Sequence, residues 1–258
     1  MTKRRKDLSE LGKWLPPDKL EAFQKNLLAW YQIHQRDLPW RRPENMTPYR
    51  ILVSEIMLHQ TQVQTVIPVY EKFLERFPTI GTLAKAPLEE IKAITDGLGY
   101  KVRGSWLKEI AEIIIEKYQG KIPQTLDALQ KLPGIGRYTA GAILSFAFQH
   151  DAPIVDVNVE RVLSRIFGVD KSGFQSPAKY QHLLWDLAHY VIPSQKGPIF
   201  NQALMDFGAL ICTARTPCCS VSPMRGICIY YRTHPQQLSI DQFFSKGPKN
   251  ELLREGSA

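Results

Sequence analysis

The sequence predicts an all-α fold built from about ten short helices. Apolar residues recur every three or four positions wherever a pattern is legible, and this is the spacing of one helix face. No convincing alternation of apolar and polar residues indicates a β-strand. Proline and glycine separate the helical stretches, as in Gly97-Leu98-Gly99, and both residue types interrupt helices.

The first helix is indicated by Asp18, a residue type that caps helix N-termini, followed by an apolar stripe. The stripe consists of Leu20, Phe23, Leu27, Trp30 and Tyr31. A second stripe consists of Leu107, Ile110, Ile114 and Tyr118. The same periodicity predicts helices over the ranges 48–59, 61–77, 86–95, 136–149, 157–167, 176–191 and 198–211. The polar segment after Tyr231 is expected to be a flexible tail.

The composition narrows the class of protein. The length of 258 residues excludes a small disulfide-stapled scaffold. The formal net charge of +8 favours a polyanionic partner, either nucleic acid or an acidic membrane surface. No apolar run is long enough to predict a membrane span. The basic run Lys3–Lys6 leads into polar residues instead of the apolar stretch of a signal peptide, so an intracellular protein is expected.

The cysteines are clustered. All four lie between Cys212 and Cys228, and Cys218 and Cys219 are adjacent. Adjacent cysteines are awkward to place in two separate disulfides, whereas closely spaced cysteines are typical of a metal or cluster site. The spacing therefore predicts metal binding. The alternative is a packed loop that keeps its cysteines as reduced thiols.

The segment from Leu132 to Ala140 predicts two helices joined by a turn that contains Gly134 and Gly136. Glycines permit close backbone approach, and the N–H groups that open the second helix can hold a phosphate without reading base sequence. This pattern is typical of a helix-hairpin-helix element that binds DNA. The alternative is a plain helical hairpin in which the glycines serve only tight packing.

Two carboxylates lie in unusual places. Glu55 stands within the apolar helical stretch from Ile51 to Leu58, where partial burial would raise its pKa and suit it to donate a proton. Asp156 follows an apolar run and precedes a predicted helix, where a carboxylate stays ionised and can face a developing positive charge. The alternatives are a glutamate on a solvent-facing helix surface and an ordinary N-cap aspartate.

Four motifs, in this order, resemble the helix-hairpin-helix DNA glycosylase superfamily (endonuclease III-like), and most closely its adenine-removing, MutY-like branch. They are Ser54 to Val63, Gly97 to Tyr100, Leu132 to Ala140, and Asp156 to Val159. The resemblance covers about residues 20–231. It implies a six-helix barrel at 47–149 inserted into a second helical domain made of 1–46 and 150–231, with DNA in the cleft between them and a tail at 232–258.

The resemblance also implies residues for DNA contact, because the target nucleotide must leave the stack before its glycosidic bond is reachable. Gln60 matches the residue that wedges into the duplex. Gly134, Gly136, Arg137 and Tyr138 match the DNA-binding hairpin. The residues at positions of the family's base pocket are Arg36, Trp40, Arg41, Leu58 and Gln202. Each of these taken alone could equally serve packing or lie on the surface.

A reaction mechanism follows from the same resemblance. Glu55 acts as the general acid that protonates N7 of adenine, because unprotonated adenine is a poor leaving group. Asp156 stabilises the oxocarbenium-like sugar or captures it as a transient covalent adduct, and Asn158 orients these groups. Tyr138 occupies the position at which bifunctional relatives carry a Schiff-base lysine, so hydrolysis without lyase activity is expected.

The family usually binds a 4Fe-4S cluster through a Cys-x6-Cys-x2-Cys-x5-Cys frame, which implies this cofactor here. In this sequence the frame reads Cys212, Cys219, Ser222 and Cys228, so a serine replaces the third ligand. A serine hydroxyl is a far weaker soft-metal ligand than a thiolate. Cys218 offers a substitute thiolate beside Cys219.

A partner motif lies in the tail. Gln237, Ile240, Phe243 and Phe244 fit a Gln-x-x-aliphatic-x-x-aromatic-aromatic pattern that resembles the motif binding PCNA-type sliding clamps. The apolar side chains can share one side of a short helical turn, and Gln237 can anchor the turn by hydrogen bonds. A clamp partner is therefore expected. The alternative is that the aromatic residues pack on the protein's own surface.

The sequence thus predicts a monomeric, monofunctional glycosylase that removes adenine mispaired with 8-oxoguanine or G. One alternative is a thymine or uracil glycosylase acting on G:T or G:U mismatches, although such relatives generally lack the Glu55 carboxylate. A second alternative is a non-catalytic DNA-binding module. Adenine glycosylases usually continue into a C-terminal domain, whereas this chain stops at Ala258, which leaves the preferred opposite base open. His59 and Val157 stand where the closest relatives usually have glutamine and glycine.

Overall fold

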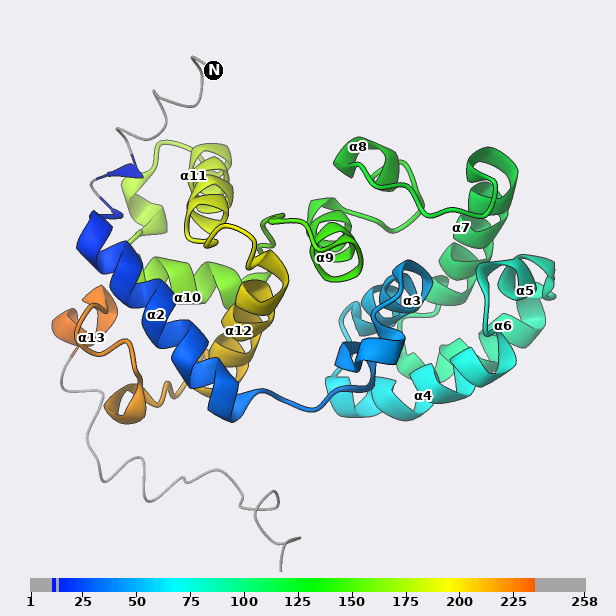
Figure 1. The fold of residues 1–258 in the computed structure, drawn as a ribbon, viewed down its shortest axis with the longest axis horizontal. Helices are drawn as coiled ribbons and strands as arrows, with labels where there is room; N and C mark the ends of the chain where they lie inside the picture. The colour runs from blue at the N-terminus through cyan, green and yellow to red at the C-terminus, as the bar shows by residue number, and fades with distance from the viewer. Residues whose placement is uncertain (1–10, 13, 235–258) are drawn as a thin grey trace, which may run out of the picture. The chain divides into compact units, whose positions relative to one another are not determined.

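The computed structural model describes residues 11–12 and 14–234, and these residues form helices and no β-strand (Figure 1). The predicted all-α fold is confirmed. The α-helices are α2 (Pro17–His34), α3 (Pro48–Leu58), α4 (Val63–Arg76), α5 (Ile80–Lys85), α6 (Leu88–Thr95), α7 (Val102–Tyr118), α8 (Leu126–Leu129), α9 (Arg137–Phe148), α10 (Val157–Phe167), α11 (Pro177–Tyr190), α12 (Gly197–Leu210) and α13 (Ile229–Thr233). The described 3-10 helices are η1 (Pro39–Arg41), η2 (Pro43–Asn45), η3 (Asp96–Leu98), η4 (Lys171–Gly173) and η5 (Cys219–Val221).

Three short helices, α5, α8 and α13, are absent from the ranges predicted by apolar periodicity, and of these only α8 is indicated in another way, as the first helix of the predicted hairpin. They contain 6, 4 and 5 residues, so none completes two turns and none develops an apolar periodicity. Their caps define two of them. Thr79 and Thr82 form a capping box at the start of α5, and the Thr125 hydroxyl accepts the Ala128 N–H at 3.4 Å at the start of α8.

The chain divides into two compact units. Unit 1 contains residues 1–34, 156–191 and 202–258, and its described part begins at Leu11 and ends at His234. Unit 2 contains residues 35–155 and 192–201. The last boundary between the two units along the chain, between residues 201 and 202, falls inside α12.

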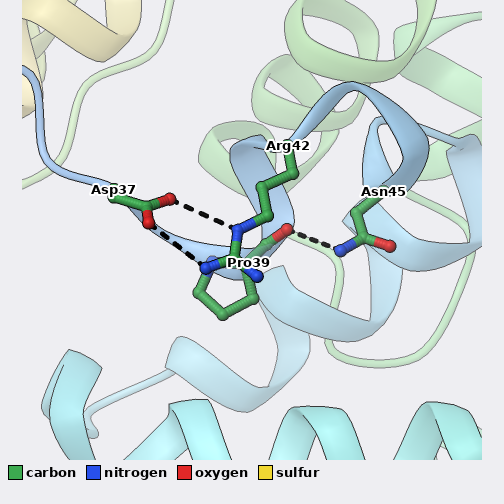
Figure 2. Close-up of polar contacts among 4 residues, drawn as sticks. All are labelled: Asp37, Pro39, Arg42 and Asn45. Carbon is green, nitrogen blue, oxygen red and sulfur yellow. Dashed lines mark hydrogen bonds and ion pairs between the residues drawn. The ribbon is translucent and has the colours of Figure 1, made fainter.

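Residues 35–46 belong to unit 2, whereas the predicted domain ranges assign them to the other domain. Figure 2 shows how this segment closes on itself. The Arg42 guanidinium donates to the Asp37 carboxylate at 3.2 and 3.3 Å, and the Asn45 amide donates to the Pro39 carbonyl at 2.7 Å. The compact segment then contacts α3 through η1. Local polar bonds of this kind produce no apolar periodicity in the sequence. The boundary at residues 34 and 35 therefore differs from the predicted one at residues 46 and 47.

Residues 192–201 also belong to unit 2, because polar bonds tie them to the segment that follows α9. The Asp151 carboxylate accepts the Gly197 N–H at 2.8 Å, where α12 begins. The buried Asn201 amide donates to the Ala152 carbonyl at 2.8 Å. The first bond satisfies a helix-start N–H that would otherwise lack a partner, and the second satisfies a buried side-chain amide.

Helix α3 lies among its neighbours in unit 2 and contacts α4, α7 and α9 (Figure 1). The Thr47 hydroxyl caps it by accepting the Arg50 N–H at 3.4 Å, and Pro48 occupies the first turn. Every residue from Ile51 to Met57 is buried. This part of α3 has no solvent-facing side, so a polar residue in it is buried whichever way its side chain points.

In unit 1, helix α10 contacts α11 and α13. At its C-terminal end Phe167 packs edge-to-face on Phe23 of α2, with 5.1 Å between ring centroids. The same helix α2 packs Trp30 edge-to-face on Phe207, at 5.4 Å. Aromatic pairs in this geometry add stabilisation beyond their buried area, so α10 has a fixed position within the unit.

The predicted clamp-binding residues Gln237, Ile240, Phe243 and Phe244 lie outside the described residues, as does most of the predicted tail, and both stay predictions. The basic run at Lys3–Lys6 also lies outside them. Within the described part of the chain, no helix combines the length and the apolarity needed to cross a membrane.

The turn between α8 and α9 depends on Gly134. Its φ is +69°, a left-handed conformation that glycine adopts without steric cost. A Cβ atom at this position would lie 2.4 Å from the Trp106 ring of α7. Both the backbone conformation and the close approach of the indole therefore require glycine.

We expect Gly134→Ala to destabilise unit 2 by about 2–4 kcal/mol, because the substitution combines left-handed strain with a clash against Trp106. Gly136→Ala is the matched control, since a Cβ atom there meets nothing within 4 Å and φ is −84°. The control should cost less than about 1 kcal/mol. Denaturant unfolding of both variants measures the difference, and equal losses would contradict the assignment.

Candidate functional site

The two helices α8 and α9 and the turn between them form a helical hairpin. Gly136 is the N-cap of α9 and provides no side-chain cap, so the first turn opens at the backbone. The first N–H groups of a helix have no acceptor within the helix and can hold an anion. Arg137 is exposed and Tyr138 is half-buried at this end. The hairpin therefore has the geometry that phosphate binding requires.

Gln60 lies in the turn that follows α3. Its φ is +54°, a left-handed conformation that costs a non-glycine residue energy unless its surroundings enforce it. Its side chain is exposed, while the flanking His59 and Thr61 are half-buried. The turn thus presents one amide side chain to solvent on a constrained backbone.

Arg103, at the start of α7, holds this turn from inside and is missed by the sequence prediction. Its side chain is 0% exposed. One terminal nitrogen donates to the His59 carbonyl and, at 2.6 Å, to the Thr61 hydroxyl. The other donates to the Leu98 carbonyl at 3.2 Å, which connects the turn with the end of η3. Burial lowers the pKa of this guanidinium.

His59 connects the same turn with the start of α9. Its Nε2 lies 3.1 Å from the Thr139 hydroxyl, and its ring packs edge-to-face against Trp106. Burial, and secondarily the charge of Arg103, lower the pKa of this imidazole. The ring is therefore held in its neutral form, and the Gln60 turn and the hairpin form one packed assembly within unit 2.

Glu55 lies within α3 and its side chain is 4% exposed. The neighbouring Ser54 and Ile56 are 0% exposed. The alternative of a glutamate on a solvent-facing surface is therefore wrong, because this helix has no solvent-facing side at Glu55. A carboxyl group in such surroundings is shielded from water, as a proton donor in an active site must be.

The predicted base-pocket residues divide between the units. In unit 2, Trp40 is buried and packs edge-to-face on Tyr70, with 5.5 Å between ring centroids. The other candidates in this unit are half-buried, namely Arg36, Arg41 and Leu58. In unit 1, the Gln202 side-chain oxygen accepts the Tyr31 hydroxyl at 2.7 Å. The position of Gln202 is therefore fixed from α2.

Asp156 is the N-cap of α10. This position agrees with the functional interpretation and also with the alternative of an ordinary N-cap aspartate. One carboxylate oxygen accepts the N–H groups of Asn158 and Val159, at 3.0 and 2.7 Å. The other accepts the Asn158 side-chain amide at 2.8 Å. Three donors therefore fix the orientation of the carboxylate, and the group is only half-buried.

Arg161, which the sequence prediction also misses, fixes the Asn158 amide. Its guanidinium donates to the Asn158 side-chain oxygen and to the Gly208 carbonyl, both at 2.8 Å. Since arginine can only donate, the amide oxygen must face Arg161 and the amide nitrogen must face Asp156. Gly208 permits the approach, because a Cβ atom there would lie 2.9 Å from Asn158.

The same arginine connects α10 with the cysteine segment. Its Nε donates to the Cys212 carbonyl at 2.7 Å. One turn later, Arg165 donates to the Thr213 carbonyl at 2.7 Å and lies 3.7 Å from the Cys212 sulfur. The first residue of the cysteine segment is thus held against α10 by two arginines.

Three cysteines line one cavity of about 20 Å³ in unit 1, and Ser222 lines it with them. They are Cys212, Cys219 and Cys228, and all three are buried. Cys218 is half-buried and is not among the residues that line this cavity. Burial raises the pKa of the Cys219 thiol to about 11 and also raises that of Cys228, so these thiols are protonated at neutral pH.

The donor set tests whether a cluster fits this pocket. Three cysteines and one serine line a common cavity, which gives the four ligand positions that an iron–sulfur cluster uses, three of them with soft sulfur and one with a harder oxygen. In the present conformation the cavity has room for about one water. Within the described residues, no group of three His, Cys, Asp or Glu side chains is arranged to hold a metal ion.

His59 gives unit 2 a predictable dependence on pH. Since folding lowers the pKa of His59 below its ordinary value of 6.5, the unfolded chain binds a proton more readily. The contribution of His59 to the free energy of unfolding is therefore fully present above about pH 6.5, and it decreases as the pH falls below this value. We expect His59→Gln to reduce this loss, measured as the change in Tm between about pH 7.5 and 5.5. The control is His182→Gln, which replaces an exposed histidine, and its Tm should fall between these pH values as much as that of the wild type. An equal fall in the Tm of His59→Gln would contradict the assignment.

Comparison with known proteins gives a consistent result. Residues 53–189 match the family of HhH-GPD superfamily base excision DNA repair proteins. The chain is 44% identical over 217 residues to the adenine DNA glycosylase of Rattus norvegicus, which covers 80% of this chain and 41% of that protein. It is 36% identical over 215 residues to the thymine/uracil-DNA glycosylase of Pyrobaculum aerophilum, covering 81% of this chain and 92% of that protein.

Among solved structures, a thermostable thymine-DNA glycosylase superposes with a TM-score of 0.78 at 34% sequence identity, covering 85% of this chain and 99% of the other. The chain spans 41% of the length of the rat adenine DNA glycosylase. A family match over more than half of the residues and a relative of similar length lead to one assignment. The chain belongs to the HhH-GPD superfamily of base excision DNA repair proteins.

Proposed function

We propose that the protein is a monofunctional DNA glycosylase that removes adenine mispaired with 8-oxoguanine or G. The observation that carries this proposal is Glu55, a carboxyl group 4% exposed within α3. Adenine leaves readily only after protonation at N7, whereas thymine leaves as a stabilised anion and needs no such acid. The 44% identity to the rat adenine DNA glycosylase supports the same choice of base.

The proposed reaction breaks the bond between C1′ of the sugar and N9 of adenine. Glu55 donates its proton to N7, and the electron pair of the breaking bond leaves with the neutral base. The Asp156 carboxylate stabilises the positive charge that develops at the sugar, or bonds to C1′ transiently. Water then adds at C1′ and gives up a proton, which restores Glu55.

Three N–H donors support the role of Asp156, because they hold its carboxylate in one orientation before the reaction begins. Asn158 serves this purpose and is itself held by Arg161. Tyr138 has a phenol in place of an amine and forms no Schiff base. Simple hydrolysis, without strand cleavage by the protein, is therefore the proposed outcome.

The proposed DNA contacts come from the helical hairpin and from Gln60. Backbone N–H groups at Gly136 and after it would hold a phosphate, with Arg137 adding charge. Gln60 would enter the duplex where the adenine leaves it. The extruded base is proposed to contact Arg36, Trp40, Arg41, Leu58 and Gln202.

A thymine or uracil glycosylase at G:T or G:U mismatches is the second candidate. It is favoured by the Pyrobaculum aerophilum relative, 92% of whose length the chain covers. The two candidates differ in what Glu55 does, because only the removal of adenine needs a proton donor for the leaving base.

We further propose that Cys212, Cys219 and Cys228 bind a 4Fe-4S cluster, with Ser222 at the fourth ligand position in preference to Cys218. Ser222 lines the same cavity as the three buried sulfur atoms. Its hydroxyl accepts the Met224 N–H at 3.1 Å, and an oxygen with a second lone pair can still face the cavity. Such a cluster would supply a covalent cross-link within unit 1, and the segment would have to widen around it.

We expect Glu55→Gln to reduce the single-turnover release of adenine by about 10²–10⁴-fold, because the amide cannot donate the proton to N7. Asp156→Asn should abolish release and leave binding to intact duplex unchanged. The matched controls are Glu112→Gln and Asp170→Asn, since Glu112 and Asp170 are exposed and Asp170 is also an N-cap. Neither control should change the rate.

The assay uses duplexes with A opposite 8-oxoguanine, A opposite G, T opposite G and U opposite G, followed by alkali to reveal abasic sites. Release of thymine or uracil alone would overturn the adenine assignment in favour of the second candidate. Binding with no release from any duplex would leave the protein a DNA-binding module without catalysis.

The cluster is tested by iron and sulfide content after anaerobic purification. We expect Cys219→Ser to lose the iron, because it removes one of three thiolate ligands. Cys218→Ser should keep the iron, and Ser222→Cys should retain it longer in air. Loss of iron from Cys218→Ser, with no effect of Ser222→Ala, would instead make Cys218 the fourth ligand.

A further inference from the structure

Arg103 is the largest side chain that is completely buried in the described part of the chain. It occupies the second position of α7, so the partial positive charge of a helix N-terminus surrounds it. Its hydrogen-bond acceptors in the described residues are neutral: two backbone carbonyls and one hydroxyl. No carboxylate compensates this charge in those bonds.

This arrangement costs stability. Removing a cation from water is expensive, and the bonds to neutral acceptors return only part of that cost. An apolar side chain of similar length would fill the same space without this desolvation penalty, and the Thr61 hydroxyl, 3.3 Å from the His59 carbonyl and 3.0 Å from the Leu98 carbonyl, would remain as a donor to either one. Arg103 extends the buried stripe formed by Leu107, Ile110 and Ile114 by one turn, so apolar packing is what the position otherwise favours. Stability alone therefore does not explain an arginine here.

The bonds of Arg103 converge on the turn that carries Gln60. The residues before and after Gln60 both accept from the same terminal nitrogen, through the His59 carbonyl and the Thr61 hydroxyl. Thr61 also donates to the Leu98 carbonyl at 3.0 Å, and Leu98 accepts from Arg103 as well. The strained residue, with φ of +54°, lies between the two anchored ones.

We propose that Arg103 is a positioning residue that holds the Gln60 turn in its left-handed conformation, so that the Gln60 side chain is ready to enter the duplex. This inference rests on the proposed function, because it assigns Gln60 to that step. The planar guanidinium fork suits the task, since it fixes two acceptors at once, which a lysine ammonium does not do with the same geometry. Preorganisation of this kind acts on the extrusion of the base and not on the affinity for phosphates.

The test replaces Arg103 with methionine, which keeps the length of the side chain and removes the charge. The control is Arg76→Met, because Arg76 is an exposed arginine of the same unit that pairs with Glu90. A duplex with 2-aminopurine beside the mismatch reports the opening of the stack by fluorescence. Single-turnover rates, duplex affinity, Tm and amide exchange at residues 59–61 are measured on the same variants.

We expect Arg103→Met to unfold cooperatively with a Tm close to that of the wild type, because the loss of a buried cation offsets the loss of its hydrogen bonds, and to bind intact duplex within about threefold of the wild type. Its fluorescence change should be lost, its base release should fall by about 10–100-fold, and the amides at 59–61 should exchange faster. Gln60→Ala should reproduce the loss of fluorescence and rate, and adding Arg103→Met to it should cause little further loss. Arg76→Met should resemble the wild type in all of these measurements.

Three results would overturn the inference. Wild-type fluorescence and rate in a folded Arg103→Met variant would show that the turn does not need the arginine. Additive losses in the double variant would show that Arg103 acts elsewhere than through Gln60. A large drop in Tm, with the affinity for intact duplex falling equally, would reduce Arg103 to a structural role. If the wild type releases no base, the proposed function fails, while fluorescence and amide exchange still decide the role of Arg103.

Discussion

Arginine guanidinium groups hold the backbone segments on which the candidate functional residues depend. In unit 1, Arg161 donates to Asn158 and to the Gly208 and Cys212 carbonyls. In unit 2, Arg103 donates to carbonyls and a hydroxyl in two loops. In the part of the chain that the structure describes, no strand ladder satisfies the carbonyls between the helices, and these must still find donors. A five-donor fork at the start of a helix supplies several of them at once.

The two candidate carboxylates differ in surroundings in the way that their proposed roles require. Glu55 lies within α3, where its neighbours Ser54 and Ile56 are 0% exposed. Asp156 lies at a helix N-terminus and accepts three N–H groups. Shielding from water suits a group that must carry a proton to a base, and fixed donors suit a group that must remain an anion beside a cation. The same chemical group, a carboxyl, is thus suited to two different proposed functions because an apolar helix interior and a helix end offer different environments.

The sequence predicts the parts of this structure that have a period or a cap. The long helices follow from apolar spacing, and Asp156 follows from its place before one of them. Glu55 is found because a carboxylate interrupts an apolar stripe. Arg103 also lies in an apolar stripe, that of Leu107, but a positively charged residue at this position is typical of an exposed helix start. The sequence therefore does not indicate that Arg103 is buried. Arg161 gives no signal, because two of its acceptors are carbonyls 47 and 51 residues away that only the fold brings near.

The serine in the cysteine segment has a limited effect on Asp156 for a physical reason. Arg161 bonds to the carbonyl of Cys212 and not to its sulfur. The backbone of Cys212 is itself held by α12, because its N–H donates to the Phe207 carbonyl at 2.8 Å. The orientation of Asn158, and with it the Asp156 carboxylate, therefore depends on the end of α12 and not on which atom stands at position 222. Ser222 can replace a thiol while the geometry around Asp156 is retained.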